Sequence, residues 1–465
     1  MMNARRWLFA LLVCALASRA TADDTKRPDA ATVAAWEKRG FADGHIRPRD
    51  WMDVPAFAPK RPKLVADLKN LPPVGVPFAL DLTGTTLPDW DVKELSGLTN
   101  LIALDLSGSW VRDAGLKNVA ALKRLRFLDV SGTAHRITDA GLKHLADHPT
   151  LTELRLDGTW VTDAGLKELA ALKSLTALSL RETGVTDAGL KHLAAFKRLR
   201  SLDVGGTAIT DDGLTAVAAL TGLQTLTLDG TPVTATGLKR LAALENLTAL
   251  ELRKLKLPDA ALEQIAQLKT LTALDLSGAE VTDIGLRLLA PLKKLTRLQL
   301  DRARVTDDAL RALREADLLH ALVLTQPKLS DARPASAAEV TTFSLYGTKV
   351  TDAGLKHLSG FANLTALDLS ETSVTDAGLK ELTVFDNLAT LDLSWTRTGD
   401  GGLKALAALK SLRELNLSRT QLTDAGLKEL ARFTDLRKLN LTRTKLDPEA
   451  VKELRRALPK CAIEW

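Results

Sequence analysis

The sequence of 465 residues has little cysteine, few aromatic residues and no strong excess of one charge. Its two cysteines exclude a disulfide framework and a cysteine-based zinc site, because either needs more thiols. Lys and Arg total 63 against 57 acids, and the formal charge of +6 is too small to indicate nucleic-acid binding. Aromatic residues make up only 4%, so the few Trp and Tyr side chains are the first candidates for binding hot spots.

The sequence also lacks a long hydrophobic run. The apolar stretch over residues 7–17 is shorter than the ~20 residues that a membrane-spanning helix needs. Arg5 and Arg6 precede it, and the small residues Ala20 and Ala22 follow at the spacing of a cleavage site. This pattern predicts a signal peptide over residues 1–22, with an uncleaved anchor as the alternative. The mature protein is expected to be exported to a periplasm, a cell surface or the medium, without a membrane span.

What the chain does have is one phrase repeated about sixteen times. LTELRLDGTWVTDAGLKELAALKS begins at Leu151, and LTALSLRETGVTDAGLKHLAAFKR begins 24 residues later at Leu175. Repetition at a fixed period indicates a repeat architecture rather than separate globular domains. The further copies begin at Leu101, Leu199, Leu223, Leu247, Leu271, Leu295, Leu319, Leu364, Leu388, Leu412 and Leu436, with less regular ones near Val76, Leu125 and Val340.

Each repeat changes its hydrophobic period halfway. Leu154 and Leu156 alternate with polar residues, which predicts a short strand, whereas the apolar residues of VTDAGLKELAAL follow a helical period. Thr162 or Asp163 can cap the start of that helix. Neither half can bury its apolar face alone, so stacked repeats must share one core. Strands stack more closely than helices. The prediction is therefore an α/β solenoid curved into a horseshoe, with parallel strands on the concave side and helices on the convex side.

The phrase LxxLxLxxT-x-[VI]-TDAGLKxLA resembles the leucine-rich-repeat family. It is similar to the ribonuclease-inhibitor-like and cysteine-containing subclasses, with Thr where Cys or Asn usually stands, as in secreted bacterial relatives. The resemblance covers residues 78–465 and implies a horseshoe that binds other molecules, usually proteins, on its concave side. It implies no catalytic residue. From the residues alone, the hydroxyls of Thr159 and Thr183 can bond the turn backbone, so this Thr is interpreted as structural.

The repeat pattern gives the domain organisation. Residues 23–77 are rich in Pro and are predicted to form an N-terminal cap with short helices near 30–39 and 63–70. Repeats occupy residues 78–446, and residues 447–465 form a C-terminal cap with a helix, a last strand and a core-facing Cys461. The repeat at 319–340 is shortened, and Arg333-Pro334 breaks its helix. A loop is expected near 330–339, either a neutral defect or a hinge.

The residue between the two inward Leu of each strand points outward. Many of these residues are acidic, so a cationic partner could relieve their repulsion. The alternative is a solvated consensus residue balanced by Arg181, Arg253 or Arg302 nearby. The outward positions are Asp81, Asp105, Asp129, Arg155, Ser179, Asp203, Thr227, Glu251, Asp275, Gln299, Val323, Ser344, Asp368, Asp392, Asn416 and Asn440.

The strongest candidate partner site lies in the first repeats. Trp110 and Trp160 occupy equivalent positions after their strands, and a two-residue insertion places His135 and Arg136 in the loop between them. Two aromatics with a cation between them can bind an acidic peptide, an aromatic side chain or a sugar ring; the alternative is that they pack on loops. The complete candidate set is Trp110, Phe127, His135, Arg136, Arg155, Trp160, Asp105, Asp129 and Asp203.

Two weaker candidates are also present. Trp395 and Tyr346 form a sparser aromatic pair. His144 and His148 have metal-ligand spacing, but a structural zinc site needs four ligands and a catalytic site three, so both are expected on a solvated convex face and no metal is predicted.

No nucleophile–base pair, phosphate-binding loop or carboxylate pair stands out, so the sequence predicts no enzyme and no cofactor. The preferred function is an exported protein-interaction scaffold that binds a protein partner on its concave face. The alternative is a carbohydrate- or envelope-binding structural protein. A ubiquitin-ligase substrate receptor of F-box type is disfavoured, because the segment before the repeats is short and follows a signal peptide.

Overall fold

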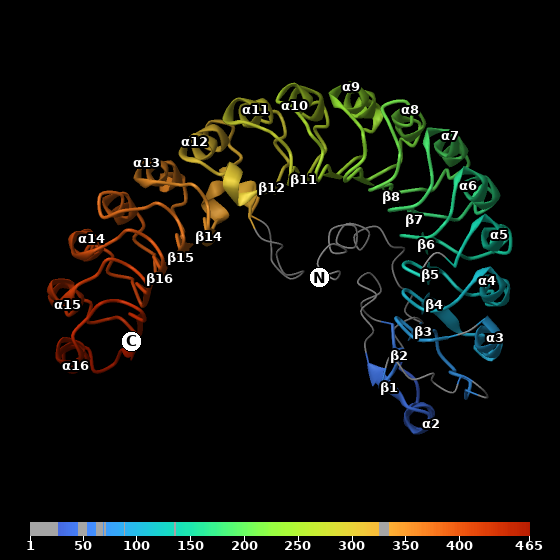
Figure 1. The fold of residues 1–465 in the computed structure, drawn as a ribbon, viewed down its shortest axis with the longest axis horizontal. Coiled ribbons are helices and arrows are strands. Elements are labelled where there is room, and N and C mark those ends of the chain that lie inside the picture. Colours follow the sequence, from blue (N-terminus) through green and yellow to red (C-terminus); the bar gives the residue numbers. More distant parts are fainter. Residues whose placement is uncertain are drawn as a thin grey trace. The chain divides into compact units, whose positions relative to one another are not determined.

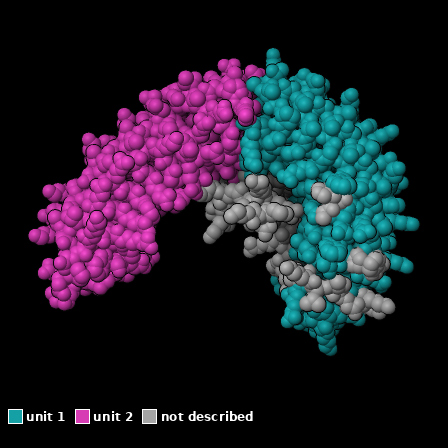
Figure 2. All heavy atoms as spheres, in the orientation of Figure 1, with its two compact units in different colours: residues 1–255 teal, residues 256–465 magenta. Residues whose placement is uncertain are grey.

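A computed structural model describes residues 27–44, 54–61, 68, 71–87, 89–133, 136–324 and 334–465. The chain forms two compact units, residues 1–255 (unit 1) and 256–465 (unit 2), coloured separately in Figure 2. In each unit the strands line one side of the stacked repeats and the helices the other (Figure 1). The predicted α/β solenoid is confirmed for both units. The predicted signal peptide over residues 1–22 lies outside the described residues.

In unit 1 the strands pair in chain order, β1 with β2 antiparallel and all later neighbours parallel. The inward leucines are in register, as Leu128 opposes Leu154 and Leu154 opposes Leu178. This register stacks one leucine of each repeat on the next. The strands are β1 Phe41–Gly44, β2 Ala56–Pro59, β3 Phe78–Asp81, β4 Leu101–Asp105, β5 Phe127–Asp129, β6 Glu153–Arg155, β7 Ala177–Ser179, β8 Ser201–Asp203, β9 Thr225–Thr227 and β10 Ala249–Glu251.

The helices of unit 1 are short because each repeat has room for only one or two turns. Several change to 3-10 geometry after their first turn. They are α2 Ala30–Lys38, α3 Asp89–Val92, η1 Lys93–Gly97, α4 Asp113–Val119, α5 Asp139–Leu142, α6 Asp163–Leu169, α7 Asp187–Leu190, η2 Lys191–Ala195, α8 Leu214–Ala218, α9 Ala235–Leu238 and η3 Lys239–Ala243.

Unit 2 contains two runs of parallel strands. β11 to β13 pair in order, and β14 to β19 pair in order, whereas β13 and β14 belong to different sheets. The strands are β11 Ala273–Asp275, β12 Arg297–Gln299, β13 Leu322–Val323, β14 Thr342–Ser344, β15 Ala366–Asp368, β16 Thr390–Asp392, β17 Glu414–Asn416, β18 Lys438–Asn440 and β19 Ala462–Glu464. The helices are α10 Ala260–Ile265, α11 Asp283–Leu288, η4 Arg302–Arg304, α12 Asp307–Glu315, η5 Leu319–Ala321, η6 Ala337–Glu339, α13 Asp352–Leu355, η7 Lys356–Gly360, η8 Leu379–Val384, α14 Asp400–Leu406, α15 Asp424–Leu430 and α16 Pro448–Ala457.

An aromatic cluster closes the N-terminal end of the core. Trp36 of α2 stacks on Phe57 with ring centroids 4.3 Å apart and meets Phe41 edge-on at 5.0 Å. Its indole N–H donates to the Pro72 carbonyl at 3.0 Å, so the buried ring leaves no unsatisfied donor. The helix expected near 30–39 is therefore present. Of the one expected near 63–70, only Leu68 is described.

The Thr that follows the strand in most repeats is structural, as its position predicts. The hydroxyl of Thr159 donates to the Leu156 carbonyl at 2.6 Å, and Thr183 repeats the contact with Leu180 at 2.6 Å. These side chains are buried, and the bond fixes the turn that leaves the strand. The same bond is made by Thr85, Thr207, Thr231, Thr348, Thr372, Thr396, Thr420 and Thr444.

A second ladder joins the helix starts of successive repeats. In the phrase TDAGL, the Thr caps its own helix, and the Asp carboxylate accepts from the backbone N–H and the hydroxyl of the next repeat's Thr. The distances are 2.7–2.9 Å to the N–H and 2.5–2.7 Å to the hydroxyl. The pairs are Asp113–Thr138, Asp139–Thr162, Asp163–Thr186, Asp187–Thr210, Asp211–Thr234, Asp259–Thr282, Asp307–Thr351, Asp352–Thr375 and Asp400–Thr423.

The same ladder explains the glycine of the phrase. A Cβ on Gly165 would overlap the Asp139 carboxylate of the preceding repeat, and one on Gly189 would overlap Asp163. The glycine makes room for a carboxylate that arrives from the neighbouring repeat.

On the helical side of unit 2, the repeat before the irregular one bonds directly to the repeat after it. Asp307 reaches Thr351 across 44 residues, and the N–H of Lys349 donates to the Val305 carbonyl at 3.1 Å. Arg314 also donates to the carbonyl of Lys356 at 3.0 Å. Among the described residues 334–340, only the single 3-10 turn η6 occupies the place of a helix, in agreement with the expected loop.

The C-terminal cap has the predicted helix and strand, but its cysteine differs. Asp447 caps α16 through the Glu449 N–H, and β19 pairs with β18. Cys461 is only partly buried rather than core-facing, and its backbone N–H donates to the Leu458 carbonyl at 3.0 Å in the turn before β19. Burial raises the pKa of its thiol.

Candidate functional site

The outward acids of the strands have a structural task that the sequence did not reveal. The carboxylates of Asp105, Asp129 and Asp203 each accept the backbone N–H of the second residue after them, at 2.8 Å. This contact closes the turn that begins each strand-to-helix loop. Three of the nine candidate residues are therefore turn-forming groups. The signal was present in the sequence as Asp or Asn at one fixed place in most repeats.

Burial and mutual repulsion perturb this acidic row in unit 1. Burial raises the pKa of Asp105 to about 7, and the neighbouring Asp129 adds to the shift. Burial likewise raises the pKa of Asp157 to about 7, with further repulsion from Asp203 and Asp129. With pKa values of about 7, the carboxyl groups of Asp105 and Asp157 are partly protonated near neutral pH. They therefore carry less negative charge than the composition of this surface suggests.

Two arginines neutralise part of the row. Arg181 binds Asp203 at 3.1 Å and Asp229 at 2.6 Å, and Arg253 binds Asp229 and Glu251 at 2.8 and 2.7 Å. Burial lowers the pKa of Arg181, but the two carboxylates outweigh that effect and raise it. The carboxylate of Asp203 is therefore paired with Arg181 of the same unit. Arg181 and Arg253 balance acidic residues of this surface, as expected from the sequence.

The predicted tryptophan site is brought together in part. Trp110 and Trp160 are 54% and 61% exposed, although a Trp ring usually fills a gap in a core. The guanidinium of Arg136 lies over the Trp110 ring, 4.9 Å from its centroid. The backbone N–H of Trp160 donates to the Ile137 carbonyl at 3.0 Å. This bond fixes the loop of Trp160 beside the loop that carries Arg136. We call Trp110, Arg136 and Trp160 the tryptophan edge.

The remaining candidates lie differently. Phe127 is buried, in one apolar cluster with Ala79, Ala103 and the cap residue Val54, and Arg155 covers its ring at 5.1 Å. Asp129 is buried as well. His135 lies outside the described residues. The exposed part of the candidate set is therefore the tryptophan edge, not the strand face beneath it.

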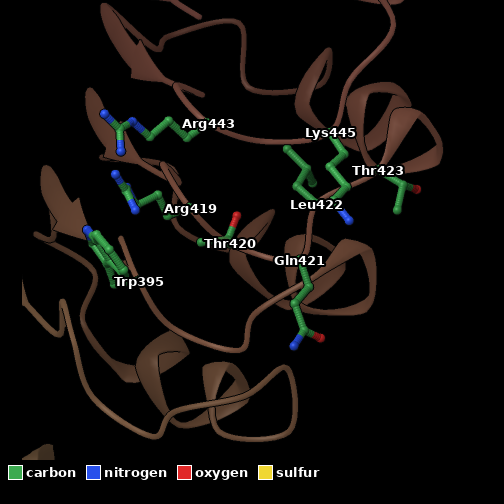
Figure 3. Close-up of a pocket in the computed structure, with 8 residues that line it drawn as sticks. All are labelled: Trp395, Arg419, Thr420, Gln421, Leu422, Thr423, Arg443 and Lys445. Atoms are coloured by element: carbon green, nitrogen blue, oxygen red, sulfur yellow. The ribbon is translucent and has the colours of Figure 1, made fainter.

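The sparser pair, Trp395 and Tyr346, shows the same construction. Arg419 lies over Trp395 at 3.8 Å, and Arg302 lies over Tyr346 at 4.2 Å, each arginine coming from an adjoining repeat. Trp395 borders a cavity of about 510 Å³ in unit 2 (Figure 3). For Trp395 the sequence signal is an Arg one repeat later, whereas Arg302 precedes Tyr346 in the chain by 44 residues, so that pair has no such signal.

His148 does not lie on a solvated face as expected. It is 4% exposed, and one ring nitrogen contacts the Leu122 carbonyl at 3.0 Å. Burial lowers the pKa of His148. In the part of the chain that the structure describes, no group of three or more His, Cys, Asp or Glu is placed to hold a metal ion. No helix in those ranges is long and apolar enough to cross a membrane.

Comparison with known proteins identifies the repeats. The family profile described as Leucine Rich repeat matches residues 97–120, 147–170, 171–194, 199–218, 267–290, 362–382, 387–407 and 408–431. These matched segments carry the phrase whose strand, turn and helix are described above. The chain is a leucine-rich-repeat protein. No curated protein matches it.

Solved structures share this leucine-rich-repeat fold. A leucine-rich-repeat protein of Leptospira interrogans is 24% identical with a TM-score of 0.56, over 83% of this chain and 95% of that one. The mouse RP105/MD-1 complex is 17% identical with a TM-score of 0.52, over 86% and 68%. An internalin of Listeria monocytogenes is 20% identical with a TM-score of 0.45, over 75% and 82%. The first two establish a common fold.

Proposed function

We propose that this leucine-rich-repeat protein is an exported, non-catalytic scaffold that binds a protein partner through the tryptophan edge of unit 1. The observation that carries the proposal is the exposure of Trp110 and Trp160 beside the cation of Arg136. Trp and Arg are the residue types most enriched in binding hot spots, and in this chain aromatic residues are scarce. Leucine-rich-repeat folds commonly bind other proteins.

The proposed partner surface lies at the edge of the strand face, not on the face itself. The strand face of unit 1 uses its acids for turns and for ion pairs with Arg181 and Arg253, so it offers few open charges there. The edge combines two flat aromatic surfaces with a guanidinium, which suits a partner carrying an aromatic or acidic side chain. A sugar ring is the competing ligand, since it also stacks on Trp.

The test is photo-cross-linking and capture. Residues 23–465 carrying a photoreactive group at position 110 are mixed with envelope and medium fractions of the source cells, and the cross-linked species is identified by mass spectrometry. Binding of that species, once purified, is then compared for the parent chain and a Trp110→Ala/Trp160→Ala variant. Loss of at least tenfold in affinity supports the site.

A matched control removes exposed apolar side chains elsewhere. Ile284 and Val384 are 64% and 55% exposed in unit 2, and their double alanine variant is expected to bind normally. Equal binding by the tryptophan variant would exclude the edge as the partner site. Retention of a glycan in place of a protein would favour the carbohydrate-binding alternative.

Export is a separate part of the proposal. Cleavage after Ala22 predicts that the protein recovered outside the cytoplasm begins at Asp23. N-terminal sequencing of the protein from fractionated cells tests this directly. A first residue of Met1 in the cytoplasmic fraction alone would contradict it.

A further inference from the structure

The cavity in the last repeats of unit 2 is lined by cations and contains no acid. Its volume is about 510 Å³, and its lining residues are Trp395, Arg419, Thr420, Gln421, Leu422, Thr423, Arg443 and Lys445. Figure 3 shows Trp395, Arg419 and Arg443 in a column along the strand ends, with Lys445 approaching from the other side. Three positive residues therefore border this space, with the two guanidinium groups on one side and the Lys445 amine on the other.

Two of these cations have no partner of their own. Within the described part of the chain, the side chains of Arg443 and Lys445 make no hydrogen bond or ion pair, whereas Arg419 lies over the Trp395 ring at 3.8 Å. The nearby carboxylate of Asp400 is occupied, since it accepts both the N–H and the hydroxyl of Thr423. The charge in the cavity is thus left for a ligand.

The backbone of Trp395, Arg419 and Arg443, the column of Figure 3, adopts an unfavourable conformation. Trp395, Arg419 and Arg443 have φ values of 58°, 55° and 59°, in the left-handed region, where the equivalent residue of many repeats is glycine, as at Gly347. A side chain at such a position destabilises the backbone relative to glycine. Four consecutive repeats accept this cost, since Glu371 in the repeat before Trp395 has a φ of 56°, and Glu182 and Lys254 in unit 1 adopt the same conformation. The column is therefore one of several places in the chain where a side chain takes the conformation that favours glycine.

The strand residues of the same repeats have lost their negative charge. At the turn-closing position, Asp368 and Asp392 accept the N–H two residues later at 2.9 and 2.8 Å. In the repeats that carry Arg419 and Arg443, the residue is Asn416 or Asn440, and its side-chain oxygen accepts the same N–H at 3.1 or 2.9 Å. The turn is kept without a carboxylate at these two positions, although Asp392, which accepts from the Asn416 amide, and Glu464, which is paired with Asn440, remain in the same row.

We propose that this cavity binds carboxylate side chains of an acidic peptide segment in a partner protein. Guanidinium groups bind carboxylates with two parallel hydrogen bonds, so Arg419 and Arg443 fit this planar group well. An acidic sugar is less well matched, because Arg419 already covers a face of the aromatic ring on which a sugar would stack. The site is separate from the tryptophan edge and does not depend on it.

The test measures binding of an octapeptide of alternating Glu and Ser, with alternating Gln and Ser as the neutral control, to the full chain by calorimetry. Arg443→Gln/Lys445→Gln is expected to weaken the acidic peptide about tenfold, because two charge-assisted contacts are lost. Arg432→Gln is the matched control, since Arg432 is exposed just after the end of α15 and pairs with Glu429 outside the cavity. It should leave binding unchanged.

A second variant separates charge from fold. Asn440→Asp keeps the acceptor for the Thr442 N–H but adds a negative charge, so it should weaken the acidic peptide several-fold and leave the neutral one unaffected. Asn416 is left unchanged, because its amide donates to the Asp392 carboxylate at 2.8 Å. Equal binding of the acidic and neutral peptides, or unchanged affinity in the Arg443/Lys445 variant, would overturn the proposal. Tighter binding of a galacturonate tetrasaccharide than of the peptide would also overturn it. The Trp110/Trp160 variant should bind the peptide normally, so failure here leaves the function proposed for unit 1 separately testable.

Discussion

Asp163 holds Thr186 of the next repeat by two hydrogen bonds at once, one to the backbone N–H and one to the hydroxyl, each 2.7 Å long. The carboxylate thereby satisfies an N–H at a helix start that the helix itself cannot satisfy. Because Thr186 also caps its own helix through the Ala188 N–H, one side chain couples two successive repeats.

Replacing Asp163 by Ala should destabilise the protein by about 1–2 kcal/mol, because the Thr186 N–H and hydroxyl lose their acceptor. Urea unfolding followed by circular dichroism measures the change. The control is Asp212→Ala, whose side chain is 86% exposed and pairs only with Arg240, and which should stay within about 0.5 kcal/mol of the parent. A similar loss in both variants would show that the ladder contact is no stronger than a surface ion pair.

Gly189→Ala should destabilise by about 1–3 kcal/mol, because the added methyl group overlaps the Asp163 carboxylate. Gly97→Ala is the matched control, since a methyl group there meets no atom within 4 Å. Combining Asp163→Ala with Gly189→Ala should cost less than the sum of the two, because the first change removes the atom that the second one strikes. Strict additivity in the same unfolding assay would refute the steric explanation.

The raised pKa of Asp105 predicts a pH dependence of stability. Folding raises the pKa of this carboxyl group from its ordinary value of 3.8 to about 7, so the protein takes up a proton on folding between these pH values. The free energy of unfolding therefore falls as pH rises from about 4 to about 7 and stays level above, by about 1–2 kcal/mol for this group.

Asp105→Asn should remove that dependence while keeping an acceptor for the Ser107 N–H, as Asn416 does for Ser418. The variant is expected to match the parent near pH 4 and to exceed it near pH 8 in thermal unfolding. Glu94→Gln, at an exposed acid of η1, is the comparison. An Asp105 variant whose melting temperature tracks the parent at every pH would contradict the assignment.

Arg443→Gly should not lower the melting temperature, because glycine adopts the φ of 59° without strain and the Arg443 side chain has no partner within the described residues. A gain of up to about 1 kcal/mol is expected. The same variant should lose affinity for the acidic octapeptide. Destabilisation instead of neutrality would show that the arginine serves the fold, not a ligand.

The repeating part of this chain was predictable because the 24-residue period fixes strand, turn and helix together. The Thr159 bond to the turn and the α16 cap also followed from residue type and position. The contacts between repeats could not be predicted in this way. Asp139 and Gly165 are 26 residues apart, and neither residue by itself indicates that the carboxylate of one lies against the other. The buried state of Phe127 depends on Val54 of the cap, whose approach to the strand face has no local signal.

For the candidate site, exposure was predictable at Trp110 and Trp160, because both stand just after a strand. The double use of Asp105 and Asp203, as turn acceptors and as members of a charged row, was not, because an outward position alone does not say which group a carboxylate meets. Left-handed residues such as Arg443 leave a trace in the sequence only when aligned with the glycines of other repeats.

The contact between Asp307 and Thr351 has a consequence for how the chain folds. Elsewhere the same contact joins residues about one repeat apart, as in Asp163–Thr186, whereas here it must close a segment of nearly twice that length. Doubling a loop adds only about 0.6 kcal/mol of closure entropy, so the link still forms. In a chain that folds by adding repeats to a growing stack, we expect this junction to close more slowly than its neighbours, because its two ends are further apart along the chain.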